Sequence, residues 1–149
     1  MIWYVFKSEA IITSDFGIFL DERCMFLLYS GNTNNVRLWR SVPKKKFDLA
    51  SFNEGNYQKS VEESISAENI TSVLYPNDST WEGKQLRLKQ QYFFCCATIQ
   101  DIVKRFKLCN TNWDDFPKLN QIQLNDTHPI IAAIELLRIL LDVERLPYQ

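Results

Sequence analysis

The chain has 149 residues, of which 46% are hydrophobic and 23% are charged, and its formal net charge at pH 7 is -1. This length suits one domain better than two, and the composition is that of an ordinary soluble globular protein. The near-neutral charge argues against nucleic acid as a partner, because nucleic-acid-binding domains carry a clear basic excess. The basic run Lys44, Lys45 and Lys46 is interpreted as a solvated loop in preference to a phosphate-binding patch.

The cysteines and the hydropathy pattern narrow the class further. None of the four cysteines stands in a C-x-x-C spacing, so the sequence predicts neither a zinc site nor a disulfide scaffold. We therefore expect a reducing, cytoplasmic compartment. No apolar run approaches the ~20 residues that a membrane-spanning helix needs, so no membrane partner is expected.

The first part of the chain predicts short strands and loops. Residues 1–31 contain apolar bursts separated by charges, which is typical of two or three short strands, and they carry no motif. Residues 30–35 predict a turn, and residues 36–39 predict a strand. Pro43 and the lysines after it predict a loop.

The middle of the chain predicts a polar helix. Residues 53–56 are typical of a helix start. The segment that follows, Tyr57 to Ile70, places Tyr57, Val61 and Ile65 on one side as a thin apolar stripe, with Ala67 as a further candidate for it. We expect such a helix to pack against a single neighbouring element or against a partner chain.

A longer helix is predicted after a turn at residues 76–79. Residues 86–108 repeat apolar side chains at helical spacing, and few charges precede Asp101. We expect most of this helix to be buried.

The last part of the chain predicts a strand, a polar loop and a helix. Residues 121–124 form the strand, and the helix runs from Pro129 to Arg145. Thr127 or Asp126 can cap this helix, and Pro129 suits its first turn, where no N–H is needed. Ligands of open α/β sheets bind at the C-terminal ends of strands, which is where Asp126 and His128 fall. The sequence therefore predicts an α/β fold with a βα unit at the C-terminus.

Several motifs resemble the glycogen/starch α-1,4-glucan phosphorylases in order and spacing. The resemblance covers residues 32–149 and does not extend to residues 1–31, and the lack of a long insert after Phe106 resembles fungal members. The matching stretches are Leu74-Tyr75-Pro76-Asn77-Asp78, Glu82 to Phe93, Ile99 to Lys107 and Gln123-Leu124-Asn125-Asp126-Thr127-His128-Pro129, with Asn34 to Trp39 and Ala67 to Ile70 upstream.

The resemblance implies part of the N-terminal domain of an enzyme with two Rossmann-like domains, of GT-B type, on either side of an active-site cleft. Such glycosyltransferases move a terminal glucose from glycogen or starch to inorganic phosphate, which gives glucose 1-phosphate. They use pyridoxal phosphate, whose Schiff-base lysine lies in the second domain, outside this segment. We therefore expect no cofactor-binding residue here and no activity of the segment alone.

The resemblance also implies roles for five residues. Asn77 and Asp78 fall in what resembles the active-site gate loop, and Arg87 resembles an arginine of the same cleft. Asp126 and His128 would line the sugar pocket as hydrogen-bonding groups, and neither is assigned as a general acid or base. The loops around Asp78 and His128 are expected to form one wall of this cleft. Without the resemblance, residues 76–79 would be a plain β-turn and His128, the only histidine, a structural residue.

A second group of residues matches a nucleotide-phosphate effector site of animal members. These residues are Arg37, Lys104 and Arg105. Lys104 stands where those members have an arginine, and lysine cannot fork onto phosphate bidentately, so a weakened site or a solvated cationic helix face is expected. Thr80 departs from the family, in which an aromatic residue is common at this position.

The segment from Tyr57 to Ile70 matches the family's protruding helix, which packs against its mate across a two-fold axis and implies a homodimer. Two alternatives to an enzyme segment remain. One is a catalytically inactive α/β binding or dimerisation module. The other is a carbohydrate-binding domain with an exposed aromatic platform that includes Trp39 or Trp81. Because the family sheet would lack strands here, we also expect poor folding of the segment by itself.

Overall fold

The computed structural model describes residues 11–12, 16–26 and 33–147, with side chains from residue 37 onward. The chain divides into two compact units, one spanning Trp3–Gln90 and the other including Gln91–Gln149. Helix α3 (Trp81–Cys109) begins in the first unit and ends in the second. No helix in the described ranges combines the length and the hydropathy that a bilayer crossing requires.

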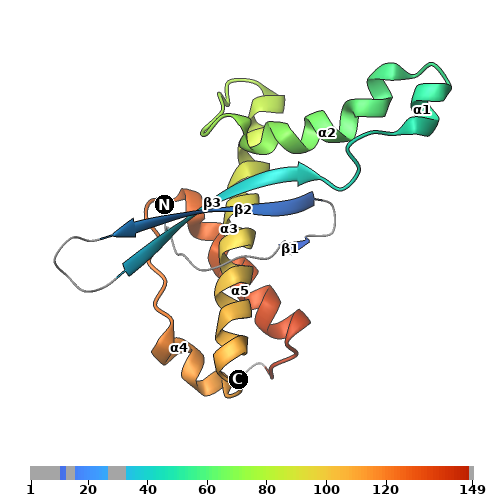
Figure 1. The fold of residues 1–149 in the computed structure, drawn as a ribbon. Helices are drawn as coiled ribbons and strands as arrows, with labels where there is room; N and C mark the ends of the chain where they lie inside the picture. The colour runs from blue at the N-terminus through green and yellow to red at the C-terminus, as the bar shows by residue number, and fades with distance from the viewer. Residues whose placement is uncertain (1–10, 13–15, 27–32, 148–149) are drawn as a thin grey trace. The chain divides into compact units, whose positions relative to one another are not determined.

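The first unit contains an antiparallel sheet in the order β1-β2-β3. The strands are β1 (Ile11–Ile12), β2 (Phe16–Phe26) and β3 (Thr33–Pro43), and the β2–β3 register places Phe16 opposite Pro43 and Phe26 opposite Thr33. Figure 1 shows β2 and β3 as a long hairpin. The predicted strand at residues 36–39 is therefore confirmed but too short, because pairing with β2 continues to both ends of β3.

Two helices follow the hairpin. α1 (Leu49–Asn53) follows the loop predicted at Pro43 and the lysines, in a stretch where the sequence predicts no element, and Gly55, with φ of 83°, makes the turn into α2 (Tyr57–Ser72). Such a positive φ costs glycine little, because it has no Cβ. The predicted polar helix is confirmed within two residues, and it packs along β3 (Figure 1).

The buried face of α2 coincides only in part with the predicted apolar stripe. Ser60, Ala67 and Ile70 are buried, whereas Tyr57 and Ile65 of the predicted stripe are 62% and 53% exposed. Small side chains let the helix lie close to the strand, and the Oγ1 of Thr71 on α2 accepts the backbone N–H of Ser41 at 3.2 Å. Of the predicted stripe, Tyr57 and Ile65 thus face solvent, whereas Ala67 is buried.

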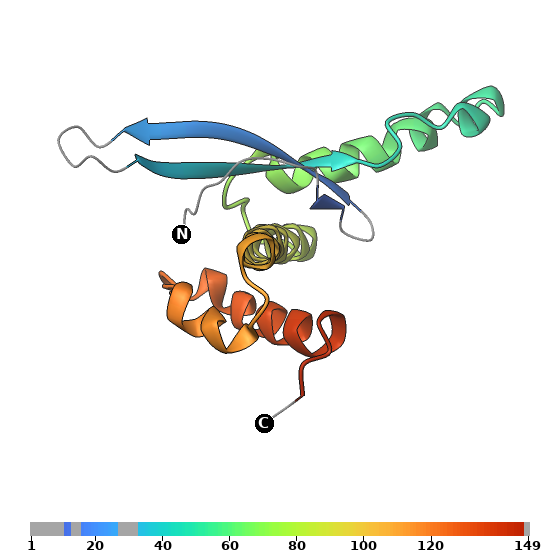
Figure 2. The ribbon, with the colours of Figure 1, turned by 60° about the horizontal axis from the view of Figure 1, so that its bottom comes forward.

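The second unit is helical within its described residues. Beyond the later turns of α3 it contains η1 (Trp113–Asp115), α4 (Phe116–Leu119), η2 (His128–Ile130), α5 (Ile131–Arg138) and the π-helical turn η3 (Ile139–Val143). Figure 2 shows α4 and α5 beside α3. One core cluster joins these helices, and its buried members are Cys95, Ile99, Ile102, Val103, Phe106, Phe116, Ala132 and Ile139.

The predicted βα unit at the C-terminus is wrong. Residues 121–124 form no strand, and the described residues of this unit contain no strand beside them. A strand is stable only when a neighbour accepts its ladder hydrogen bonds, so an alternating pattern alone does not form one. The predicted helix from Pro129 is instead split into η2, α5 and η3.

A buried carboxylate is paired with an exposed arginine in this unit. Glu135 is 1% exposed and accepts two hydrogen bonds from Arg138, from Nε to Oε2 and from Nη2 to Oε1, both at 2.8 Å. Gln100 adds a third at 3.4 Å. Burial alone would raise the pKa of Glu135, but the hydrogen bonds from Arg138 and Gln100 outweigh it, and the net pKa lies below the ordinary value. The carboxylate is therefore ionised and paired at neutral pH.

Candidate functional site

The gate loop predicted around Asp78 begins where α2 ends. Tyr75 has φ of 55°, a left-handed conformation that bulky residues rarely adopt. Its backbone N–H donates to Oε1 of Gln90 at 2.9 Å. The Nε2 of the same side chain donates to the carbonyl oxygens of Ile70 at 2.7 Å and Val73 at 2.8 Å. One glutamine of α3 thus holds the start of the loop.

The tip of the loop carries the two residues that the sequence singles out. The Oδ1 of Asn77 accepts the N–H of Ser79 at 2.8 Å, which closes a tight turn. The Oδ2 of Asp78 lies 3.0 Å from Nη1 of Arg87, so the structure brings together the predicted loop carboxylate and the predicted cleft arginine. Both side chains reach solvent, and exposed ion pairs contribute only about 0–1 kcal/mol. The ion pair therefore adds little to the stability of the loop.

Thr80 ends the loop and starts α3. Its Oγ1 accepts the N–H of Gly83 at 3.1 Å, and its carbonyl oxygen accepts the N–H of Lys84 at 3.0 Å. This is the geometry of a helix N-cap, which gives the threonine a local role in starting α3. A Cβ added at Gly83 would overlap the carbonyl oxygen of Asn77, so the loop backbone lies directly on this glycine. Trp81, the first residue of α3, is mostly exposed.

The second predicted loop places Asp126 beside His128. Asp126 has φ of 67°, a conformation that aspartate tolerates better than most residues, and its Oδ1 accepts the N–H of Thr127. This hydrogen bond and, to a lesser degree, His128 hold the pKa of Asp126 below its ordinary value. Thr127 occupies the predicted cap position of η2, but its side chain makes no capping hydrogen bond.

The imidazole of His128 lies between two polar side chains. Its Nε2 is 3.3 Å from Oδ2 of Asp126, and its Nδ1 is 3.3 Å from Nε2 of Gln91. Since a carboxylate can only accept, the neutral ring carries its hydrogen on Nε2, and Nδ1 accepts from the amide of Gln91. His128 is thereby oriented by a residue of α3.

The three residues of the predicted effector-phosphate site have different surroundings. Arg37 is 2% exposed in β3, with its guanidinium carbon 5.9 Å from the ring centroid of Trp39. Lys104 is exposed on α3, and Nε of Arg105 lies 3.2 Å from Oδ2 of Asp101. Arg37 belongs to the first unit and the other two to the second, so the phosphate site stays a prediction. The same holds for the predicted common wall, because Asp78 and His128 also belong to different units.

The described residues offer neither a metal site nor a cofactor lysine. Over residues 37–147, no cluster of three or more His, Cys, Asp and Glu side chains is placed to hold a metal ion. Every lysine with a described side chain is exposed. A Schiff-base lysine needs a desolvated site that lowers its pKa, so none of these lysines fits that role.

Sequence reasoning missed three residues that organise these loops. Gln90 holds the loop stem, Gln91 contacts His128, and Gly83 makes room for the loop backbone. The only signal in the sequence is a pair of adjacent glutamines within an otherwise aromatic stretch of a helix. Adjacent glutamines on a helix are usually interpreted as solvent-exposed surface, so this pair does not indicate a functional site.

Comparison with known proteins gives the class of this chain. A model of the carbohydrate phosphorylases matches residues 23–149. The chain therefore belongs to the carbohydrate phosphorylase family.

Several relatives are called glycogen phosphorylases. The chain is 52% identical over 119 residues to the glycogen phosphorylase of Saccharomyces cerevisiae, a stretch that covers 80% of this chain and 13% of that protein. It is 54% identical over 114 residues to glycogen phosphorylase 2 of Dictyostelium discoideum, which covers 76% of this chain and 12% of that protein. The liver form of human glycogen phosphorylase is 49% identical over 129 residues, with 80% and 15% covered. The chain thus spans less than a sixth of the length of these relatives.

Proposed function

We propose that this chain is a segment of an α-1,4-glucan phosphorylase, an enzyme that transfers the terminal glucose of glycogen or starch to inorganic phosphate. The observation that carries the proposal is the match over residues 23–149, with about half of the residues identical to glycogen phosphorylases. The helix-rich α/β architecture is compatible with part of a GT-B type N-terminal domain. Asn77, Asp78, Arg87, Asp126 and His128 are the proposed pocket residues.

The chemistry of these residues suits recognition of a sugar and an anion. Asp78 and Arg87 form an exposed ion pair, and a phosphate dianion can replace the carboxylate because both compete for the same guanidinium. Asp126 keeps free acceptor positions beside His128, as a pocket that binds sugar hydroxyls requires. In this proposal the segment binds and orients, and it carries no general acid or base.

The proposed reaction needs pyridoxal phosphate, which supplies a phosphate group at the reacting centre. No described lysine fits its attachment, so we place the cofactor in the remainder of the whole protein. Purified 1–149 is accordingly expected to release no glucose 1-phosphate from glycogen and phosphate. Pyridoxal-dependent turnover by this chain alone would contradict that expectation.

A chimera tests the proposed activity. Residues 37–147 would replace the matching segment of the Saccharomyces cerevisiae relative, and glucose 1-phosphate formation from glycogen would be measured. We expect activity close to that of the parent, and a loss on changing His128→Ala that the surface change Lys118→Ala does not cause. An inactive but folded chimera, or one indifferent to His128→Ala, would refute the assignment.

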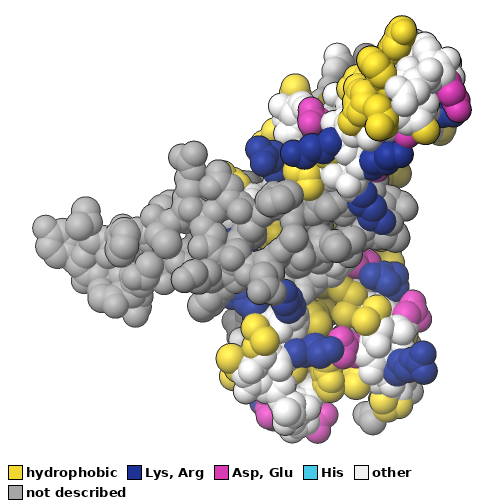
Figure 3. Space-filling view, turned by 45° about the vertical axis from the view of Figure 1, so that its right-hand side comes forward, with side chains coloured by type: hydrophobic (Ala, Val, Ile, Leu, Met, Phe, Trp, Pro, Cys, Tyr) yellow, Lys and Arg dark blue, Asp and Glu magenta, His cyan; other side chains and the backbone are white. Residues whose placement is uncertain are grey.

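We also propose that the whole protein is a homodimer that uses the exposed face of α1 and α2. Phe52 packs against Phe47 and Tyr57, with ring centroids 5.2 and 4.8 Å apart, yet all three rings remain exposed. Figure 3 shows hydrophobic side chains gathered at this end of the unit. Continuous apolar surface of this kind marks an interaction site.

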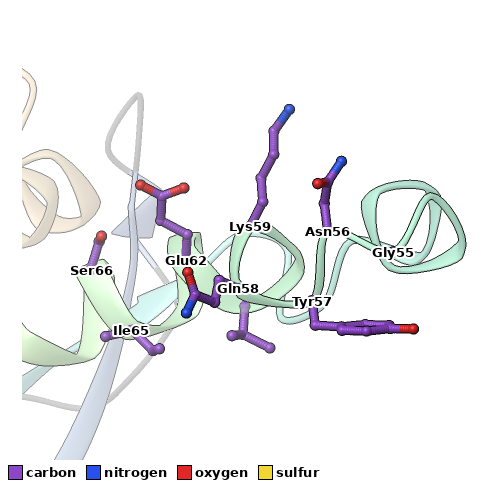
Figure 4. Close-up of a pocket in the computed structure, with 9 residues that line it drawn as sticks. Gly55, Asn56, Tyr57, Gln58, Lys59, Glu62, Ile65 and Ser66 are labelled. Atoms are coloured by element: carbon purple, nitrogen blue, oxygen red, sulfur yellow. The ribbon is translucent and has the colours of Figure 1, made fainter.

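A groove along α2 continues this apolar surface. Figure 4 shows Lys59 and Glu62 projecting from one side of the helix and Tyr57 from the other. The residues that line the groove are Gly55, Asn56, Tyr57, Gln58, Lys59, Val61, Glu62, Ile65 and Ser66. Two copies related by a two-fold axis can pair such a face with itself. Light scattering on the chimera should give a dimer, and Phe52→Ser with Tyr57→Ser should give monomers; a variant that remains dimeric would refute this interface.

A cytoplasmic location is part of the same proposal. An exposed free thiol at Cys109 suits a reducing compartment. The alternative of a catalytically inactive binding or dimerisation module predicts dimers without any activity of the chimera, so the two measurements above separate it from the enzyme. The carbohydrate-platform alternative predicts glucan binding by 1–149 that Trp81→Ala abolishes.

A further inference from the structure

We propose that Gln90 is the positioning residue of the gate loop: its buried amide fixes the loop stem at Tyr75 and confines movement of Asn77 and Asp78 to residues 76–79. The inference rests on the proposed function of this loop. It adds the residue that holds the loop and the point at which the loop can bend.

The buried amide of Gln90 uses its acceptor and both of its hydrogens in hydrogen bonds to the loop stem. Its side chain is 2% exposed, and its amide makes the three hydrogen bonds of 2.7–2.9 Å to Ile70, Val73 and Tyr75. A buried polar group that loses its partners costs far more than an exposed one, because water cannot replace them. The stem is therefore the most strongly held part of the loop.

The rest of the loop is held by solvent-exposed contacts, unlike its stem. Beyond Tyr75, the side-chain contacts of Asn77 and Asp78 are exposed to solvent. At the far end, Thr80 is held as the cap of α3. Residues 76–79 therefore lie between two fixed points, and Tyr75, already in a left-handed conformation, is the residue at which the free segment begins.

The partners of Gln90 require an amide at this position. Only an amide offers both an acceptor for the N–H of Tyr75 and two hydrogens for the carbonyl oxygens of Ile70 and Val73. A carboxylate of the same shape would keep the acceptor but face two carbonyl oxygens without any hydrogen. Protonating that carboxylate would return one hydrogen. The change Gln90→Glu therefore makes the stem dependent on pH, which the wild-type stem is not.

Amide hydrogen exchange on the chimera, followed by mass spectrometry of peptides that contain Tyr75, tests the proposal. Exchange of the Tyr75 N–H should accelerate about 10- to 100-fold in Gln90→Glu at neutral pH, because the carbonyl oxygens of Ile70 and Val73 lose their donors and repel the carboxylate, which opens the stem. After correction for intrinsic exchange, this acceleration should shrink when acid protonates the introduced carboxylate. Gln85→Glu, an exposed glutamine on the same helix, is the matched control and should leave Tyr75 unchanged at every pH.

Gln90→Met is the second variant, because it keeps the length of the side chain and removes all its hydrogen bonds. It should accelerate Tyr75 exchange at every pH, with no recovery in acid. Unchanged Tyr75 exchange in both variants would overturn the proposal. So would a loss of protection spread equally over α2 and β3, since that result describes a residue needed only for folding. Failure of the proposed enzymatic function would appear in the chimera assay and would not alter these exchange rates.

Discussion

Replacing Arg138 by alanine should destabilise the helical unit by leaving a buried carboxylate without its cation. Glu135 is 1% exposed and receives both hydrogen bonds of the Arg138 fork at 2.8 Å. Breaking a buried pair from one side costs about 3–5 kcal/mol. The arginine side chain itself is 44% exposed, and water near it softens the loss, so we expect the lower end, about 3 kcal/mol at pH 7.

The pH dependence makes this prediction specific. Because the pKa of Glu135 lies below its ordinary value of 4.5 in the folded chain, its pairing stabilises the fold above about that pH. This contribution is lost as the pH falls through the lower folded pKa. In Arg138→Ala the unpaired carboxyl binds a proton more readily, so the difference between variant and wild type should shrink in acid.

Urea unfolding of chain 1–149, followed by circular dichroism at several pH values, gives the free energy of unfolding for both proteins. Lys118→Ala is the control, since the Lys118–Asp115 pair has the same three-residue spacing along the chain but lies at the surface, and it should change little. A loss below about 1 kcal/mol in Arg138→Ala at pH 7 would refute the reasoning, because it would mean that Glu135 is not desolvated. An equal loss at pH 7 and in acid would refute the role of its charge.

Four further predictions concern the same chain. Phe106→Ala should lower the free energy of unfolding by about 3–5 kcal/mol, because Phe106 is buried. Its ring centroid lies 5.3 Å from that of Trp113 and 5.0 Å from that of Phe116. A loss under about 1 kcal/mol would contradict this packing. Nitrogen NMR of the single histidine should show the hydrogen on Nε2, and Gln91→Glu should shift the population toward Nδ1, whereas an unchanged spectrum would exclude the contact with Gln91. Burial raises the pKa of Cys96 to about 12 and also raises the pKa of Cys95. In a Cys24→Ser background, a thiol reagent at pH 8 should therefore modify only Cys109 before the chain unfolds. Labelling of Cys96 in the folded chain would contradict its burial. Ile134→Lys should reduce binding of a hydrophobic dye, since Ile134 and Leu137 are exposed on α5, and equal dye binding would show that another surface is responsible.

The helices were the predictable part of this fold. The spacing of apolar residues indicates both α2 and the long α3, because a helix satisfies its backbone within its own segment and its periodicity survives in the sequence. The strand predicted at residues 121–124 fails for the opposite reason, since a strand depends on a neighbour that the sequence pattern cannot supply. The short α1 was missed because five residues are too few to show a period.

The candidate site was predictable only in its loops. Turn-forming residues and the resemblance lead to Asp78 and His128, and the structure adds Arg87 and Gln91 as their respective partners. That Arg87 meets Asp78, nine residues earlier, depends on how the loop folds back over Gly83. Gln90 was invisible for a related reason: its three partners are backbone groups, and any sequence offers those.

Helix α2 departs in part from the usual relation between hydropathy and burial. Ser60 and Ala67 are buried together with Ile70, while Tyr57 and Ile65 reach solvent. Charged residues at the exposed apolar positions Tyr57 and Ile65 should therefore make the isolated segment more soluble and leave the sheet contact intact. A bulkier side chain at the small buried positions Ser60 and Ala67 should instead displace the helix.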